Sequence, residues 1–236
     1  MNKMIELAAL GQSVWYDNIS RKLLAGGELK ELIDSGLRGL TSNPAIFEKA
    51  IAGGEGYGDD IKALAARGLS SREIYEELAL ADIGRAADLM APVHAAAGGR
   101  DGFVSIEVSP ELARDAAGTV KEALRLKERL GRANVMIKVP ATPECLPAVR
   151  ELTAAGVSAN VTLIFSVENY RAVAAAYIAG LRDLLGRGGD PRGVSSVASF
   201  FVSRIDSAVD ADLDRLGAPE LKARAAIANA KAAYLA

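Results

Sequence analysis

Lys138 is the residue whose chemistry most needs an explanation in this sequence of 236 residues. It lies in the run NVMIKVPAT, where Val135, Met136, Ile137 and Val139 predict a buried strand. Lysine is rarely fully buried, because an ammonium group withdrawn from water needs a partner or loses its proton. A desolvated lysine amine is a nucleophile toward carbonyl groups, so the sequence predicts Schiff-base chemistry at Lys138.

Such chemistry also needs carboxylates, because breaking a C–C bond next to an iminium requires protons to be moved. Asp17 and Glu107 follow or end predicted strands and are the candidates for this role. Apart from Lys138, each of the polar residues at the strand ends, taken alone, is more simply a helix cap, a turn residue or an outward-facing side chain. Besides the two carboxylates and Lys138 they are Asn18, Thr41, Ser42, Asn43, Asn160, Thr162, Ser199 and Arg204.

Short apolar runs alternate with longer helical patterns along the whole chain. The predicted strands span residues 13–17, 37–41, 102–108, 134–139, 159–165 and 194–201. The predicted helices span 71–95, 110–130 and 166–185, and residues 44–68 form an additional helix and loop. This alternation predicts parallel βα units, and the sequence lacks the glycine patterns of nucleotide-binding sheets. The expected fold is a (β/α)8 barrel, in which catalytic residues stand at the C-terminal ends of several strands.

Composition narrows the class of protein. Half of the residues are hydrophobic and a quarter are charged, as in ordinary globular proteins. A net charge of −2 without a basic run gives no indication of nucleic-acid binding. The single Cys145 and the single His94 remove an internal disulfide framework and most metal-site readings. No stretch reaches the roughly 18 to 20 uninterrupted apolar residues that span a bilayer, so we expect a cytoplasmic protein without membrane contact.

Six segments in order together resemble the transaldolase family in its longer bacterial branch. They are GQSVWYDNISR, GLRGLTSNPAIFEKAI, DGFVSIEVSP, NVMIKVPATPE, NVTLIFSVENY and SFFVSRID. The resemblance implies a class I aldolase-type barrel that needs no cofactor or metal. It also implies transfer of a dihydroxyacetone unit between sugar phosphates in the pentose phosphate pathway. The sequence does not fix the oligomeric state, and a homodimer stays open.

The resemblance assigns roles position by position. Lys138 matches the Schiff-base lysine, and Asp17 matches the acid/base that acts on the sugar hydroxyl during C–C cleavage. Glu107 and Thr162 match the pair that holds a catalytic water. The remaining matches are residues that bind substrate: Thr41, Ser42, Asn43, Asn160, Ser199 and Arg204. Of these, Ser199 and Arg204 match part of the phosphate site.

The sequence departs from the family pattern at three points. Cys145 replaces a usual glycine and Ser158 a common asparagine, and both flank the matched residues without replacing them. Only about six of the eight expected βα units can be placed in residues 1–236, so we expect a single barrel domain that is incomplete at its C-terminus. The branch includes chains fused to a glucose-6-phosphate isomerase, and the sequence does not decide whether this chain had that partner.

Two other functions stay open at this level. One is a related Schiff-base aldolase that acts on fructose 6-phosphate or free dihydroxyacetone, which product analysis with erythrose 4-phosphate would separate from a transaldolase. The other is a non-catalytic partial barrel, which size-exclusion chromatography and a thermal melt would reveal.

Overall fold

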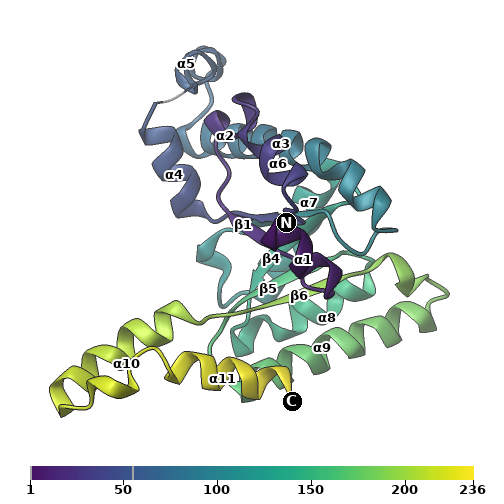
Figure 1. Ribbon diagram of the computed structural model, residues 1–236. Coiled ribbons are helices and arrows are strands. Elements are labelled where there is room, and N and C mark those ends of the chain that lie inside the picture. The colour runs from purple at the N-terminus through teal and green to yellow at the C-terminus, as the bar shows by residue number, and fades with distance from the viewer. Residues whose placement is uncertain (1, 55) are drawn as a thin grey trace. The chain divides into compact units, whose positions relative to one another are not determined.

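The computed structural model describes residues 2–54 and 56–236 and places six strands in one sheet, in the chain order β1-β2-β3-β4-β5-β6 (Figure 1). The strands are β1 (Trp15–Asp17), β2 (Gly39–Thr41), β3 (Phe103–Glu107), β4 (Val135–Pro140), β5 (Ala159–Ile164) and β6 (Ser196–Phe200). All six predicted strands are confirmed, with ends that differ by at most two residues. Sequential parallel strands linked by helices are the units of a (β/α)8 barrel, and the chain contains six of them.

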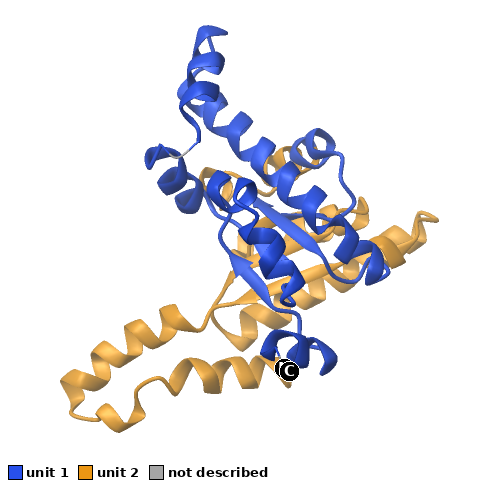
Figure 2. Ribbon diagram, turned by 45° about the horizontal axis from the view of Figure 1, so that its top comes forward, with its two compact units in different colours: residues 1–107, 125–137 blue, residues 108–124, 138–236 orange. Residues whose placement is uncertain are grey.

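The chain divides into two compact units, residues 1–107 with 125–137 and residues 108–124 with 138–236 (Figure 2). We call them unit 1 and unit 2. Unit 1 holds the first six helices: α1 (Lys3–Ala9), α2 (Arg21–Ala25), α3 (Glu28–Asp34), α4 (Pro44–Ala52), α5 (Gly58–Ala66) and α6 (Ser71–Ala96). Helix α7 (Ala116–Leu130) and strand β4 contribute residues to both units. Unit 2 holds α8 (Leu146–Ala154), α9 (Val167–Gly186), α10 (Ser203–Leu216) and α11 (Ala225–Tyr234), with the short 3-10 turns η1 (Pro110–Leu112), η2 (Pro143–Cys145), η3 (Pro191–Gly193) and η4 (Pro219–Leu221).

In unit 1, β1 and β2 pair in parallel, and β2 pairs with β3. Trp15 lies opposite Gly39, and a Cβ at Gly39 would come within 2.3 Å of the Trp15 ring. Glycine is therefore required in β2, because the indole occupies the space of a side chain. Helix α6 begins with a complete capping box, in which Ser70 and Glu73 exchange side-chain and backbone hydrogen bonds.

In unit 2, β5 pairs in parallel with β6, and α8 packs on α9. The helix contact is close, because a Cβ at Gly180 of α9 would come within 2.5 Å of the Thr153 Cβ atom. Ser166 accepts a hydrogen bond from the backbone N–H of Asn169 and caps α9, which confirms the helix predicted over 166–185.

Two predicted helical segments differ from the structure. Pro110 belongs to the separate turn η1, and α7 begins only at Ala116, where the Asp115 carboxylate accepts from the Gly118 N–H at 2.9 Å. The helix predicted over 110–130 therefore starts six residues too early. The segment 44–68, expected as one helix and a loop, contains the two helices α4 and α5; Glu55 within it lies outside the described residues.

Candidate active site

Lys138 lies in a strand whose six residues are all buried. Only 7% of its surface is exposed, and its backbone carbonyl accepts a hydrogen bond of 3.1 Å from the Val108 N–H in unit 2. The neighbouring Ile137 and Val139 are fully buried. Lys138 is therefore largely shielded from water and lies among apolar neighbours, as the sequence predicted.

Strands β5 and β6 of unit 2 bring two of the predicted binding residues together. The Ser199 hydroxyl donates a hydrogen bond of 2.7 Å to Oδ1 of Asn160. Asn160 is 1% exposed and lies two residues before the equally buried Thr162 on the same strand. These three side chains supply an amide and two hydroxyl groups, which suit the hydroxyl groups of a sugar.

Arg204, in the first turn of α10, is held by an aromatic ring of unit 2, and no carboxylate of the described residues forms a salt bridge with it. Its guanidinium carbon lies 4.7 Å from the centre of the Phe201 ring. The centres of the Phe201 and Phe165 rings lie 5.1 Å apart. Stacking on a ring face leaves the edge of a guanidinium able to donate in its plane, and this edge is the part that pairs with phosphate oxygens. Sequence reasoning missed this support, although the spacing of Phe201 and Arg204 by three residues is a signal for it.

The ends of β1 and β2 in unit 1 hold the next group. Asp17 is exposed and lies opposite Thr41 in the parallel register. The Ser42 hydroxyl donates to the carbonyl of Ser105 in β3 at 2.8 Å, and Oδ1 of Asn43 accepts from the Ile46 N–H at 3.0 Å as the cap of α4. Ser42 and Asn43 thus have structural roles in unit 1, and the side-chain oxygen of Asn43 is used for capping.

Two buried hydroxyl oxygens have no hydrogen-bond partner among the described residues, and both belong to predicted site residues. They are Oγ1 of Thr41 in unit 1 and Oγ1 of Thr162 in unit 2. Leaving a buried polar atom unsatisfied costs free energy, so such atoms in a native protein call for a specific explanation. Both threonine hydroxyls are able to accept a hydrogen bond from a water or another hydroxyl group, or to donate one to it.

Glu107 is the last residue of β3 and acts on a nearby phenol in unit 1. Burial raises the pKa of Tyr75 to about 12, and the negative charges of Glu107 and Glu48 add to this shift. The Tyr75 ring also packs edge-on against Phe47 of α4, with 6.4 Å between the ring centres. The Glu107 carboxylate therefore lies close to a phenol that stays protonated at neutral pH.

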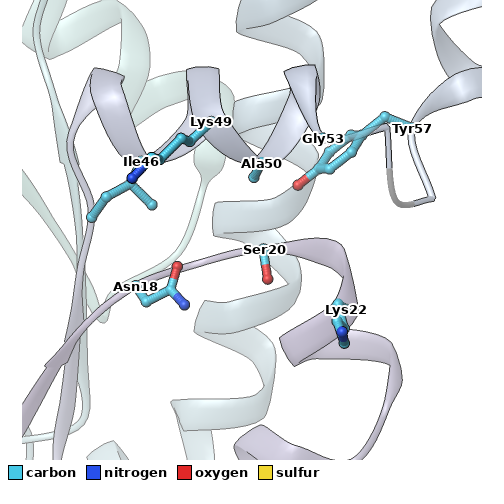
Figure 3. A pocket seen from close by; sticks show the side chains of 8 residues that line it. All are labelled: Asn18, Ser20, Lys22, Ile46, Lys49, Ala50, Gly53 and Tyr57. Carbon is cyan, nitrogen blue, oxygen red and sulfur yellow. The ribbon is translucent and has the colours of Figure 1, made fainter.

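A cavity of about 340 Å³ opens beside the residues that follow β1 (Figure 3). It lies between α4 and the segment leading into α2, and both elements contribute side chains. Its lining comprises Asn18, Ser20, Lys22, Ile46, Lys49, Ala50, Gly53 and Tyr57. The amide, the hydroxyl groups and the two ammonium groups give it a polar, positively charged wall one residue beyond Asp17.

The two departures in sequence have structural roles in unit 2. Cys145 is buried, and its sulfur lies 3.4 Å from the Ala113 carbonyl oxygen. The Ser158 hydroxyl accepts from the Ser195 N–H at 3.1 Å, which links the segments that lead into β5 and β6. Cys145 thus supports the turn at Ala113, and Ser158 supports the backbone that leads into Asn160.

Residues 2–54 and 56–236 contain no group of three or more His, Cys, Asp or Glu side chains placed to hold a metal ion. Within the same ranges, every helix is too short or too polar to cross a bilayer.

Comparison with known proteins gives one consistent family. The family model described as transaldolase/fructose-6-phosphate aldolase matches residues 14–236. Transaldolase 1 of Streptomyces coelicolor is 51% identical over 97% of this chain, and the transaldolase of Trichodesmium erythraeum is 47% identical over 99% of it. The transaldolase of Neisseria gonorrhoeae is 48% identical over 99% of this chain. The matched part covers 61%, 64% and 66% of these three relatives, so the chain spans less than two thirds of their length.

Proposed function

Because the chain belongs to the transaldolase/fructose-6-phosphate aldolase family, we propose that it moves a dihydroxyacetone unit between sugar phosphates through a Schiff base on Lys138. The donors are fructose 6-phosphate and sedoheptulose 7-phosphate, and the acceptors are erythrose 4-phosphate and glyceraldehyde 3-phosphate. The observation that carries the proposal is the burial of Lys138 within an otherwise apolar strand.

The reaction begins with attack of the neutral Lys138 amine on the ketone carbon of the donor. The carbinolamine that forms loses water and becomes an iminium ion. The bond between C3 and C4 of the sugar then breaks, and its electron pair moves into the iminium to give an enamine. Addition of the enamine to the acceptor aldehyde and hydrolysis of the new iminium release the product and the free lysine.

Asp17 and the Glu107–Thr162 pair handle different protons in this scheme. Asp17 takes the proton of the C4 hydroxyl as the C3–C4 bond breaks and returns it when the new bond forms. Glu107 and Thr162 hold the water through which protons move during loss of water from the carbinolamine and during its reversal. The unpartnered Thr162 hydroxyl supports this second role, because a water would satisfy it.

The other predicted residues bind the substrate. Thr41, Ser42, Asn43 and Asn160 donate to or accept from sugar hydroxyl groups, and Ser199 and Arg204 hold the phosphate. The stacking of Arg204 on Phe201 supports the phosphate assignment, because it orients the guanidinium without neutralising it. We place this reaction in the cytoplasmic pentose phosphate pathway.

Borohydride trapping with fructose 6-phosphate tests the proposal. Reduction of the iminium should add sugar mass to the peptide that contains Lys138, and Lys138→Ala should remove the label. Lys127 is the matched competitor, because burial lowers its pKa, while its ammonium donates to the carbonyls of Arg132 and Val135 at 2.9 and 3.4 Å. Labelling at Lys127, or equal labelling after Lys138→Ala, would refute the assignment. Formation of sedoheptulose 7-phosphate or glyceraldehyde 3-phosphate only in the presence of erythrose 4-phosphate separates transfer from aldol cleavage.

A further inference from the structure

Leu163 of β5 has a backbone conformation that leucine rarely adopts. Its φ is 66°, and among the described residues only Ala223 is another non-glycine residue with positive φ. The left-handed region is unfavourable for residues with a Cβ atom, and glycine or asparagine usually occupies it. Burial does not explain why a leucine stands at this position, because the Leu163 side chain is 37% exposed, whereas Thr162 and Ile164 on either side are buried.

The same residue interrupts the register of the sheet. Val161 lies opposite Ala198 of β6, but the next pair is Ile164 with Phe200. Thr162 and Leu163 together therefore face the single residue Ser199, which defines a β-bulge in β5. A bulge bends its strand locally and redirects the adjoining side chain, and such bulges are frequent beside active sites.

Backbone hydrogen bonds fix both sides of this bulge within unit 2. The Thr162 carbonyl accepts from the Ala141 N–H at 2.8 Å, and the Ile164 carbonyl accepts from the Phe201 N–H at 2.9 Å. These two hydrogen bonds hold β5 on both of its edges. A shift of the strand along its neighbours therefore cannot remove the bulge. Leu163 therefore lies between these two fixed points and directly after Thr162, whose buried Oγ1 has no partner among the described residues.

We propose that Leu163 is a positioning residue, whose left-handed backbone aims the Thr162 hydroxyl at the water used to form and hydrolyse the iminium. This inference rests on the proposed function and extends it by one residue that makes no contact with substrate. Strained backbone is retained in proteins where surrounding structure and function require it, and the unsatisfied Thr162 hydroxyl identifies what is being positioned here.

Substitutions that differ in their tolerance of positive φ test the proposal. Leu163→Ile keeps the size and composition of the side chain, but its β-branched Cβ resists this conformation, whereas Leu163→Gly accepts it. Leu163→Ala removes the exposed side chain and keeps an unbranched Cβ, so it serves as the control for packing. The rate of formation of the borohydride-trappable iminium is measured for each purified variant and normalised to the total trappable fraction, together with its melting temperature.

We expect Leu163→Ile to slow iminium formation between about tenfold and a hundredfold, because small displacements of a reacting group have effects of that size. Leu163→Gly and Leu163→Ala should stay within about threefold of the parent rate, since both leave Thr162 in place. Leu163→Val, smaller but also β-branched, replaces Leu163→Ile if that variant does not fold. Equal losses in the glycine and isoleucine variants would overturn the inference.

A double substitution separates positioning from a general structural role. In a Thr162→Val background, Leu163→Ile should change the rate by no more than about twofold, because the hydroxyl that it misplaces is already gone. Its effect on the melting temperature should persist in that background. A full additional loss of rate would show that Leu163 does not act through Thr162. The series is made in residues 1–236 followed by the C-terminal part of the Streptomyces coelicolor relative that this chain does not match. If this chimera traps no iminium at Lys138, the proposed function fails; if it does and the Leu163 series is flat, only this inference fails.

Discussion

The hydroxyl of Ser199 donates a hydrogen bond of 2.7 Å to Oδ1 of Asn160 and thereby joins two candidate binding residues across β5 and β6. The bond fixes which end of the buried Asn160 amide faces Ser199, and so fixes the direction of its nitrogen. A binding group that is oriented before substrate arrives loses less entropy when it binds.

Ser199→Ala should therefore weaken substrate binding through loss of this orientation. We expect a loss of about 1 kcal/mol, or roughly a fivefold rise in KM, with little change in kcat. Steady-state kinetics with fructose 6-phosphate measure it, and Ser196→Ala on the same strand is the control. The effects of Ser199→Ala and Asn160→Ala should not add, and strict additivity would contradict coupling between the two side chains.

Strands β3, β4 and β5 were predictable because parallel strands covered on both faces have continuous apolar sequences. All six strands lie within two residues of the positions expected from sequence. The start of α7 could not be predicted in the same way. Pro110 gave a strong helix-start signal, but the actual cap, Asp115, lies five residues later. Local propensity alone does not decide between two such signals.

The site was only partly predictable. The sequence pattern identified Lys138, and the structure places it in a fully buried strand. No sequence signal indicated the positive φ at Leu163, because leucine is not a residue that signals this conformation. The catalytic and binding roles of Lys138 and of the other candidate residues stay predictions until kinetics test them.

Asp17 and Glu107 should fail in different steps. Asp17→Ala should still form the Schiff base with dihydroxyacetone but lose cleavage of fructose 6-phosphate by about 10²-fold or more, because no base takes the C4 hydroxyl proton. Glu107→Gln should slow formation of the Schiff base itself by about 10- to 100-fold. Trapping and cleavage are measured separately, with Asp59→Ala in α5 as an exposed control. Parallel loss of both activities in the two variants would contradict this division.

Arg204→Ala should weaken binding of phosphorylated substrates and leave the chemistry intact. Arg204 is exposed, so its charged hydrogen bonds are worth about 1 to 2 kcal/mol, which corresponds to a rise in KM of roughly 5- to 30-fold. Reaction with dihydroxyacetone, which has no phosphate, should be nearly unchanged. Arg192→Ala, an exposed arginine paired with Asp190, is the control. An equal loss with both substrates would instead identify Arg204 as a structural residue.

Glu76 of α6 should contribute stability that disappears in acid. Hydrogen bonding to Arg125, together with the charge of Arg129, lowers the pKa of Glu76 from its ordinary value of 4.5. A depressed pKa in the folded state gives stability that is complete above about pH 4.5 and is lost as pH falls through the lowered value. Glu76→Gln should cost about 1 kcal/mol at pH 7 and reduce the loss of stability in acid.

Urea unfolding at pH 7 and at about pH 3.5 measures both effects, since this interval spans the titration of an ordinary glutamate. Glu77→Gln is the matched control, because this next residue of the same helix forms an ion pair with Arg129, whereas Glu76 pairs with both Arg125 and Arg129. Identical pH profiles for the parent protein and Glu76→Gln would contradict the role of this cluster.

A polypeptide made of residues 1–236 alone should have little transaldolase activity. In the sheet order, β1 and β6 each have one neighbouring strand, and no residue of β6 is buried. A strand edge without a partner favours association with other chains. Exposed apolar side chains in unit 2 act in the same direction, with Leu216 79% and Leu235 84% exposed. Catalysis needs its groups held within about 0.5 Å by surrounding packing, and an open edge loosens that packing.

The activity of the 236-residue polypeptide is measured as turnover of fructose 6-phosphate with erythrose 4-phosphate. Size-exclusion chromatography first separates monomer from aggregate. The control is a chimera in which residues 1–236 are followed by the C-terminal part of the Streptomyces coelicolor relative that this chain does not match. We expect the chimera to be active and Lys138→Ala within it to be inactive, because the chemistry resides in residues 1–236 and the added part supplies its support. A normal enzyme rate from the monomeric 236-residue polypeptide would show that six strands hold the site without further support.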